Sequence, residues 1–99
     1  MDYTLLIVDD EDNFREGLKE VYKDRFRVLD ASNLTEARKI LKTQPVELIL
    51  LDVNIKSEFG PDLLTDVRRM EPKPKVIILT AFGDVDTAVN AMKNGADDF

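Results

Sequence analysis

Cysteine and histidine are both absent from the sequence. Without cysteine there are no disulfides and no thiolate sites, which is compatible with a cytoplasmic protein. Without histidine, the commonest general base and metal ligand is missing. No apolar run approaches the roughly 20 residues of a membrane-spanning helix, and the start MDYTLLIV lacks the basic residues of a signal peptide. We therefore expect a protein that has no membrane partner.

Positive charge is scarce as well. The 99 residues include 20 acids against 14 lysines and arginines, which gives a formal net charge of -6. The bases form no stripe, because Arg68 and Arg69 are only a pair. Binding to nucleic-acid phosphates draws on clustered bases, so no direct nucleic-acid partner is expected. The length and an apolar content of 43% fit one small domain over residues 1–99.

Four short aliphatic runs alternate with helical patterns. The runs are TLLIV (4–8), RVLDA (27–31), ELILL (47–51) and KVIIL (75–79). The first helix is expected to bury Phe14, Leu18 and Val21. The second is expected to start at Asn33, with Glu36 as its capping-box partner. The third is expected to follow Pro61, and the fourth to run from about Asp84 to Gly95. Packing roles are expected for Phe14, Phe26, Met70 and Met92. Strands that alternate with helices predict an α/β fold with a parallel sheet.

Polar residues follow three of the expected strands. Asp9 and Asp10 come after the first, Asp52 after the third and Thr80 after the fourth. Functional groups gather at the carboxyl ends of strands in open α/β sheets. These residues meet if the sheet is a flavodoxin-like, doubly wound one with the strand order 2-1-3-4. The alternative for such aspartates is a helix N-cap, which is how Asp12 is interpreted, whereas Glu11 fits a solvated acid.

Converging carboxylates require a counter-charge. At an effective dielectric constant near 20, two unit charges about 4 Å apart cost roughly 4 kcal/mol. A bound cation offsets this repulsion, and hard oxygen ligands with open water positions suit Mg²⁺ better than a softer metal. The stretch LLIVDDED (5–12) therefore predicts a magnesium site.

The motifs LIVDDE (6–11), LILLDVNI (48–55), VIILTAF (76–82) and NGADDF (94–99) span nearly the whole chain. In this order and spacing, the sequence resembles the response-regulator receiver domain, the phospho-acceptor part of bacterial two-component signalling. The segment FGDVDTAVNAMKNGADDF (82–99) is more narrowly similar to receivers of NtrC-type transcriptional activators. The resemblance implies a cytoplasmic phosphorylation switch in transcription regulation rather than an enzyme.

The resemblance also implies individual roles. Asp52 is the nucleophile that accepts a phosphoryl group from the phosphohistidine of a histidine kinase. Asp9, Asp10 and Asp52 hold Mg²⁺, together with the backbone carbonyl of Asn54. Thr80 donates a hydrogen bond to the phosphoryl group.

A switch role is implied for Thr80 and Phe99. Phe99 falls at the position of the family's switch aromatic, and its ring is expected to follow Thr80 toward the phosphorylated site. The surface around the helix expected at 84–94 then changes for a partner or an output domain, which lies outside this chain.

Two departures from the family pattern stand out. Lys56 occupies a position where the family usually has proline, so the loop KSEFGP (56–61) is expected to be looser, although Gly60 matches the family's glycine. The family's lysine, three residues beyond Phe99, and its complete fifth strand and fifth helix do not occur within residues 1–99. We therefore expect a C-terminally truncated receiver domain whose strand 75–80 forms an edge, which favours a homodimer. Asp97 and Asp98 are expected to be solvated.

Two other functions remain open from the sequence. One is a Mg²⁺-dependent phosphatase of the haloacid-dehalogenase type, which also uses an aspartate after a parallel strand. That family requires a second aspartate two residues later, where this chain has Asn54. The other is an inert, receiver-like interaction module that keeps the fold but takes no phosphate.

Overall fold

A computed structural model describes residues 3–79, 93 and 95–97 of the chain. The elements in chain order are β1 (Thr4–Val8), α1 (Asp12–Tyr22), β2 (Arg27–Ala31), α2 (Leu34–Thr43), β3 (Leu48–Asp52), β4 (Asn54–Ile55), β5 (Glu58–Phe59), the 3-10 helix η1 (Gly60–Asp62), α3 (Leu63–Val67) and β6 (Lys75–Leu79). The predicted alternation of strands and helices is confirmed as far as Leu79. The helix expected from Asp84, and Met92 in it, lie outside the described residues.

The main sheet has the order β2-β1-β3-β6, and all of its pairs are parallel. This confirms the flavodoxin-like order 2-1-3-4 predicted from the sequence, with β6 as the fourth strand. The third strand runs one residue later than expected, from Leu48 to Asp52. Glu47 lies just before it, and its carboxylate accepts the N–H of Thr4 at 2.6 Å. At the far end of the sheet Asp52 pairs with Leu79 of β6.

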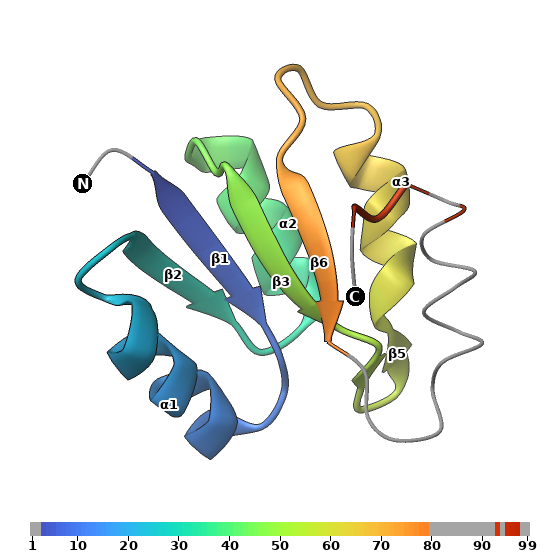
Figure 1. Ribbon diagram of the computed structural model, residues 1–99. Coiled ribbons are helices and arrows are strands. Elements are labelled where there is room, and N and C mark those ends of the chain that lie inside the picture. The colour runs from blue at the N-terminus through green and yellow to red at the C-terminus, as the bar shows by residue number, and fades with distance from the viewer. Residues whose placement is uncertain (1–2, 80–92, 94, 98–99) are drawn as a thin grey trace.

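Helices cover both faces of the sheet (Figure 1). Side chains alternate along each strand, so Leu6 and Val8 of β1 face one core while Leu5 and Ile7 face the other. The larger core includes side chains of α2 and α3. The smaller one contains Leu50 and, at its margin, residues of α1 and the chain after it. The sheet is therefore buried on both sides, as its continuous apolar strands predict.

The buried face of α1 differs from the expected one. Phe14 and Val21 are 45% and 67% exposed, so the expectation that they pack in the core is wrong. Leu18 packs against the smaller core, as expected, but its neighbour on this face is Tyr22, whose ring meets that of Phe26 edge-on at 6.1 Å. The helix is rotated because Arg15, three residues before Leu18, also turns inward and pairs with Asp30 on β2.

The predicted start of α2 is confirmed. The side chain of Asn33 accepts the N–H of Glu36 at 2.8 Å, and Glu36 in turn accepts the N–H of Ser32 at 2.8 Å. Leu34, Ala37 and Leu41 are buried, as the periodicity indicates. Phe26 and Met70 are partly buried against the cores, which also matches the prediction. Pro61 lies in the first turn of η1, directly before α3.

Asp97 lies beside β6 rather than only in solvent. Its N–H donates to the carbonyl of Val76 at 2.8 Å, and its carboxylate accepts the N–H of Val76 at 2.8 Å. Asp97 is exposed, as expected, and these two bonds in addition attach it to β6. Among the described helices, none has the length and apolar character needed to cross a membrane.

Candidate functional site

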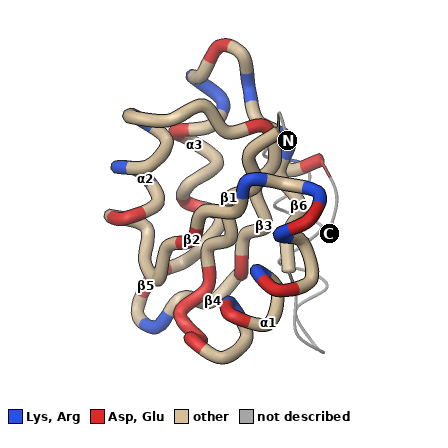
Figure 2. The backbone as a smooth tube through the Cα atoms, turned by 90° about the vertical axis from the view of Figure 1, so that its left-hand side faces the viewer, with Lys and Arg blue, Asp and Glu red and all other residues tan. Residues whose placement is uncertain are grey.

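The carboxyl ends of β1 and β3 bring acidic residues together. Val8 pairs with Leu51, and the next residues along the two strands are Asp9 and Asp52. One carboxylate oxygen each from Asp9, Asp10 and Asp52 lies within 4.8 Å of the others. In Figure 2 acidic residues gather around this end of the molecule, beside α1 and β4. The convergence expected from the strand order is thus present in the structure.

The turn between β1 and α1 is held by a series of hydrogen bonds. Asp9 is only 4% exposed; its N–H donates to the carbonyl of Ala31 at 3.1 Å, and its Oδ1 accepts the N–H of Glu11 at 2.8 Å. Glu11 caps α1, since its Oε1 accepts the N–H of Asn13 at 3.2 Å. The expected roles of Glu11 and Asp12 are therefore corrected: Glu11 is the N-cap, and Asp12 is the first residue of the helix.

Burial and the repulsion between neighbouring acids raise the pKa values of Asp9 and Asp52. The pKa of Asp52 rises to about 6, first because the carboxyl group is buried and then because Asp9 lies close by; N–H groups of Asn54 and Val53 act in the opposite direction. Burial also raises the pKa of Asp9, although the N–H of Glu11 partly offsets it. The acidic cluster is therefore a site where negative charge is costly and a cation is favoured.

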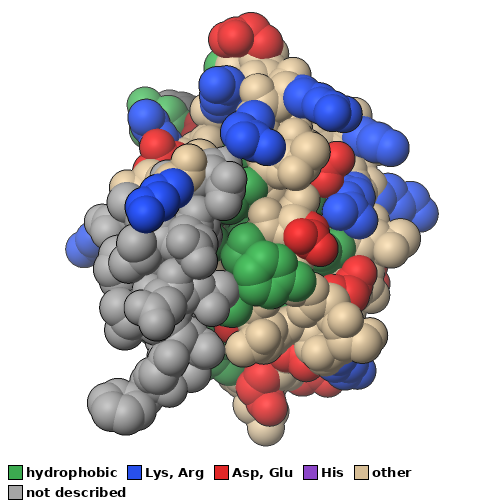
Figure 3. All heavy atoms as spheres, turned by 90° about the vertical axis from the view of Figure 1, so that its right-hand side faces the viewer, with side chains coloured by type: hydrophobic (Ala, Val, Ile, Leu, Met, Phe, Trp, Pro, Cys, Tyr) green, Lys and Arg blue, Asp and Glu red, His purple; other side chains and the backbone are tan. Residues whose placement is uncertain are grey.

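The acidic cluster is not neutralised by direct ion pairs with described basic side chains. Among the described residues, no lysine or arginine forms an ion pair with the carboxylates of Asp9, Asp10 or Asp52. On the face seen in Figure 3, lysine and arginine side chains lie mainly in the upper half, at the end where the chain passes from α3 to β6. That end is opposite to the carboxyl ends of the strands. An all-oxygen set of carboxylates that forms no ion pair with a described lysine or arginine fits a hard divalent cation such as Mg²⁺.

The loop after Asp52 forms a short hairpin. Asn54–Ile55 and Glu58–Phe59 pair as a small antiparallel hairpin. Its turn begins with Lys56, whose φ of 54° lies in the left-handed region. Proline cannot adopt this φ, because its ring holds φ near about −65°. The turn at Lys56 is therefore one that a proline at this position could not form.

Gly60 brings this loop back against the acidic strand end. Its N–H donates to the carbonyl of Val53 at 2.7 Å. The residue is buried, and its Cα faces the backbone of Asp52. The end of β3 is thus fixed from the side by the chain that follows it.

The predicted site residues divide into two groups. The structure brings Asp9, Asp10 and Asp52 together, and it places Asn54 two residues on, exposed at the start of β4. Thr80 and Phe99 lie outside the described residues. Arg15 was missed by the sequence reasoning, although its spacing of three residues from both Asp12 and Leu18 indicates a polar contact on the buried side of α1.

The fold and this acidic cluster are those that the resemblance to a receiver domain predicts. The response regulator receiver domain family matches residues 5–99, and the chain belongs to that family. The chain is 40% identical over 96 residues to the response regulator protein PilR of Pseudomonas aeruginosa, and 40% identical over 98 residues to a putative NtrX-like response regulator of Rickettsia bellii. Both are NtrC-type regulators, as the narrower resemblance predicts.

A solved structure is similar as well. A response regulator of Burkholderia pseudomallei, crystallised with a phosphorylated aspartic acid, a calcium ion and citrate, superposes with a TM-score of 0.89 at 28% identity and covers 98% of this chain and 58% of its own. The matches cover 95% and 96% of this chain, but only 21% of PilR and 20% of the NtrX-like protein. The chain thus spans about a fifth of the length of these curated relatives. The comparisons support neither the phosphatase nor the inert module.

Proposed function

We propose that this domain is a phospho-acceptor switch in which Asp52 takes a phosphoryl group from a histidine kinase. The observation that carries the proposal is the convergence of Asp9, Asp10 and Asp52 within 4.8 Å at the ends of β1 and β3. The phosphorylated aspartic acid of the similar Burkholderia pseudomallei regulator supports it. The metal is Mg²⁺, held by these carboxylates and by the backbone carbonyl of Asn54.

The residues around Asp52 contribute mainly by binding and orienting the phosphoryl group. Phosphoryl transfer has a loose transition state, so it depends mainly on positioning and on neutralising charge. When bound, Mg²⁺ neutralises charge on the phosphoryl oxygens. An oxygen of Asp52 forms the new bond to phosphorus while the bond to the histidine nitrogen breaks. With a pKa of about 6, Asp52 is mostly ionised at neutral pH and thus ready to act as the nucleophile.

Signal output follows from the added charge. A phosphoryl group brings close to two negative charges to the ends of β1 and β3. Thr80 donates a hydrogen bond to it and Phe99 follows, so that the surface around residues 84–94 changes for a partner. The partners are a histidine kinase and an output domain that acts in transcription regulation, and the site of action is the cytoplasm.

Direct phosphorylation tests the proposal. The protein is incubated with a small phosphodonor and Mg²⁺, and its intact mass is measured. A single phosphoryl adduct is expected that disappears in Asp52→Asn and after removal of Mg²⁺ with a chelator. Asp24→Ala serves as the matched control, since it removes an exposed acid far from the cluster. An adduct that persists in Asp52→Asn, or none in the unaltered protein, contradicts the proposal.

A further inference from the structure

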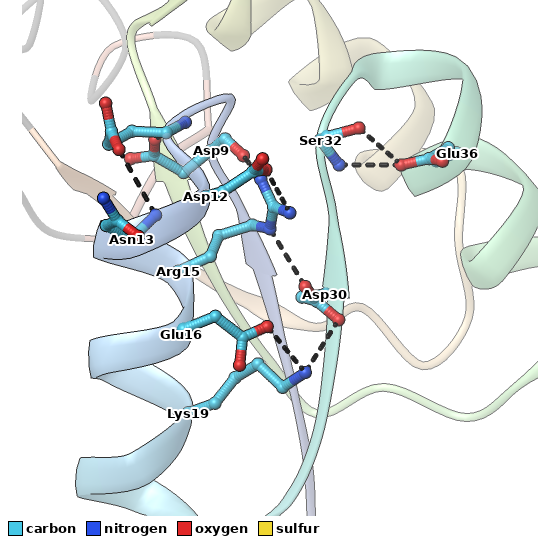
Figure 4. Close-up of polar contacts among 10 residues, drawn as sticks. Asp9, Asp12, Asn13, Arg15, Glu16, Lys19, Asp30, Ser32 and Glu36 are labelled. Carbon is cyan, nitrogen blue, oxygen red and sulfur yellow. Dashed lines mark hydrogen bonds and ion pairs between the residues drawn. The ribbon is translucent and has the colours of Figure 1, made fainter.

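Arg15 connects the acidic turn to its surroundings. Its side chain is 11% exposed and makes three contacts with different parts of the fold. Nη1 donates to the backbone carbonyl of Asp9 at 2.8 Å, Nε to Oδ2 of Asp30 at 2.9 Å, and Nη2 to Oδ1 of Asp12 at 2.8 Å. Figure 4 shows the guanidinium group between Asp12 and Asp30, with Asp9 above it. One planar group therefore links β2, the first turn of α1 and the end of β1.

The contact with the carbonyl of Asp9 completes the hydrogen bonding of the backbone in this turn. Asp9 follows the last residue of β1, and its N–H still bonds to Ala31, the last residue of β2. Within the described residues, no backbone N–H outside the helices and strands donates to the carbonyl of Asp9. Strand pairing ends here, so the carbonyl of Asp9 has no donor from a neighbouring strand, and Arg15 supplies one. A buried carbonyl without a donor is costly, so this contact fixes the peptide plane that follows Asp9.

The peptide that Arg15 fixes joins the first two acids of the cluster. The carbonyl of Asp9 belongs to the peptide bond between Asp9 and Asp10, so its direction determines where both side chains point. Oδ1 of Asp9 is oriented further by the N–H of Glu11 at 2.8 Å. Both restraints act within this turn, while Asp52 is placed independently by β3.

Charge alone does not explain the arrangement. Asp30 pairs with Arg15 at 2.9 Å and with Lys19 at 3.4 Å, while Asp12 pairs with Arg15 at 2.8 Å. Glu16 pairs with Lys19 at 3.5 Å as well, so three acids surround these two bases. The charge of Arg15 lowers the pKa of Asp9 only as a lesser cause after burial, and the direct contact of Arg15 with the cluster is its hydrogen bond to the carbonyl of Asp9.

We propose that Arg15 is a positioning residue for the divalent cation. By fixing the carbonyl of Asp9 it keeps the carboxylates of Asp9 and Asp10 directed toward Asp52. The identity of the cation rests on the proposed function. The ordering of the turn rests only on the hydrogen bonds of Arg15 and Glu11 to Asp9. Lysine keeps the charge of Arg15 but lacks the planar fork that reaches three acceptors.

Mg²⁺ affinity, measured by calorimetry, tests the role. Arg15→Lys is expected to weaken binding about tenfold, the lower end of the effect of groups that orient metal ligands. Arg15→Gln is expected to weaken it as well, although loss of a positive charge alone would strengthen binding. Lys19→Met is the matched control, since it also removes a base from Asp30 but has no contact with Asp9; unchanged or slightly tighter binding is expected. Circular dichroism checks that each variant is folded.

Amide hydrogen exchange without metal provides a second readout. The amide of Glu11 donates to Asp9, so its protection is expected to fall in Arg15→Lys and to persist in Lys19→Met. Unchanged Mg²⁺ affinity in Arg15→Lys, or tighter binding in Arg15→Gln, overturns the inference. If the unaltered protein does not bind Mg²⁺, the proposed function fails, and exchange at Glu11 then decides whether Arg15 orders the turn.

Discussion

Gly60 lies directly against the backbone carbonyl of Asp52. A β-carbon placed on Gly60 would lie 1.7 Å from the oxygen of Asp52 and 2.9 Å from its carbonyl carbon. Both neighbours are backbone atoms, so no side chain can rotate away to make room. Glycine is therefore required at this position by contact rather than by a special φ.

Replacement of Gly60 by alanine is expected to destabilise the domain. The added methyl group forces the chain after β3 to move, with an expected loss of about 1–3 kcal/mol in the free energy of unfolding. Urea denaturation measures this. Gly17→Ala is the control, because Gly17 has open space around its Cα within α1, and it is expected to stabilise the protein by about 0.5–1 kcal/mol. Equal stability of Gly60→Ala and the unaltered protein would contradict the close contact.

Lys56 is expected to be replaceable by glycine but not by proline. Glycine adopts a φ of 54° without steric cost, so Lys56→Gly is expected to raise the free energy of unfolding by up to about 1 kcal/mol. Proline cannot reach this φ, so Lys56→Pro is expected to lower it by more than about 1 kcal/mol. Thermal and urea denaturation of the pair measure both changes. A proline variant as stable as the glycine variant would show that the hairpin turn is not the one described.

Asp10→Ala is expected to raise stability without metal and to weaken metal binding. The charge of Asp10 adds to the repulsion on Asp9 and Asp52. Its removal should stabilise the metal-free protein by up to about 1 kcal/mol, since the charges are partly solvated. The Mg²⁺ affinity should fall by about tenfold or more. Denaturation with and without Mg²⁺ measures both effects, and Asp24→Ala should change neither by a similar amount. Unchanged Mg²⁺ affinity would remove Asp10 from the site.

The contribution of Asp52 to the stability of the metal-free protein is expected to fall as pH rises from about 4 to about 6. The pKa of Asp52 is raised from 3.8 to about 6, so the folded state holds this proton in a range where the unfolded state has released it. Stability from the protonated group is therefore present at low pH and is lost as pH rises through the folded pKa. After allowance for solvent screening, the loss is on the order of 1 kcal/mol.

Asp52→Asn provides the comparison for this pH dependence. Asparagine does not titrate, so the profile of the variant should be flatter between pH 4 and 7, with the raised pKa of Asp9 leaving a residual slope. Urea denaturation across the pH range, in a chelating buffer, measures the difference. Identical profiles for the two proteins would contradict the raised pKa of Asp52.

The sheet and the acidic cluster follow from local sequence patterns. Continuous apolar blocks predict strands that are buried on both faces, and acids directly after two of them predict the convergence of Asp9 and Asp52. These features depend on residues adjacent in sequence and on the general rules for parallel sheets, so no tertiary detail is needed to predict them.

The rotation of α1 and the turn at Lys56 could not be predicted from the local sequence pattern. Helical periodicity permits the stripe of Phe14, Leu18 and Val21 as readily as that of Leu18 and Tyr22. The choice between them is made by Arg15, through its bonds to Asp9 and Asp30 on other elements. Likewise, nothing in KSEFGP reveals a left-handed residue at Lys56, since lysine rarely adopts that conformation.

The small hairpin after Asp52 also reaches the start of α2. The carboxylate of Glu58 on β5 accepts the N–H of Leu34, the first residue of α2, at 3.1 Å. Four of the N–H groups at a helix start lack partners within the helix, so this bond satisfies one that the cap leaves open. A displacement of the hairpin consequently costs α2 a bond in its first turn. The tip of β3 is in this way joined, through the hairpin that follows it, to the first turn of α2.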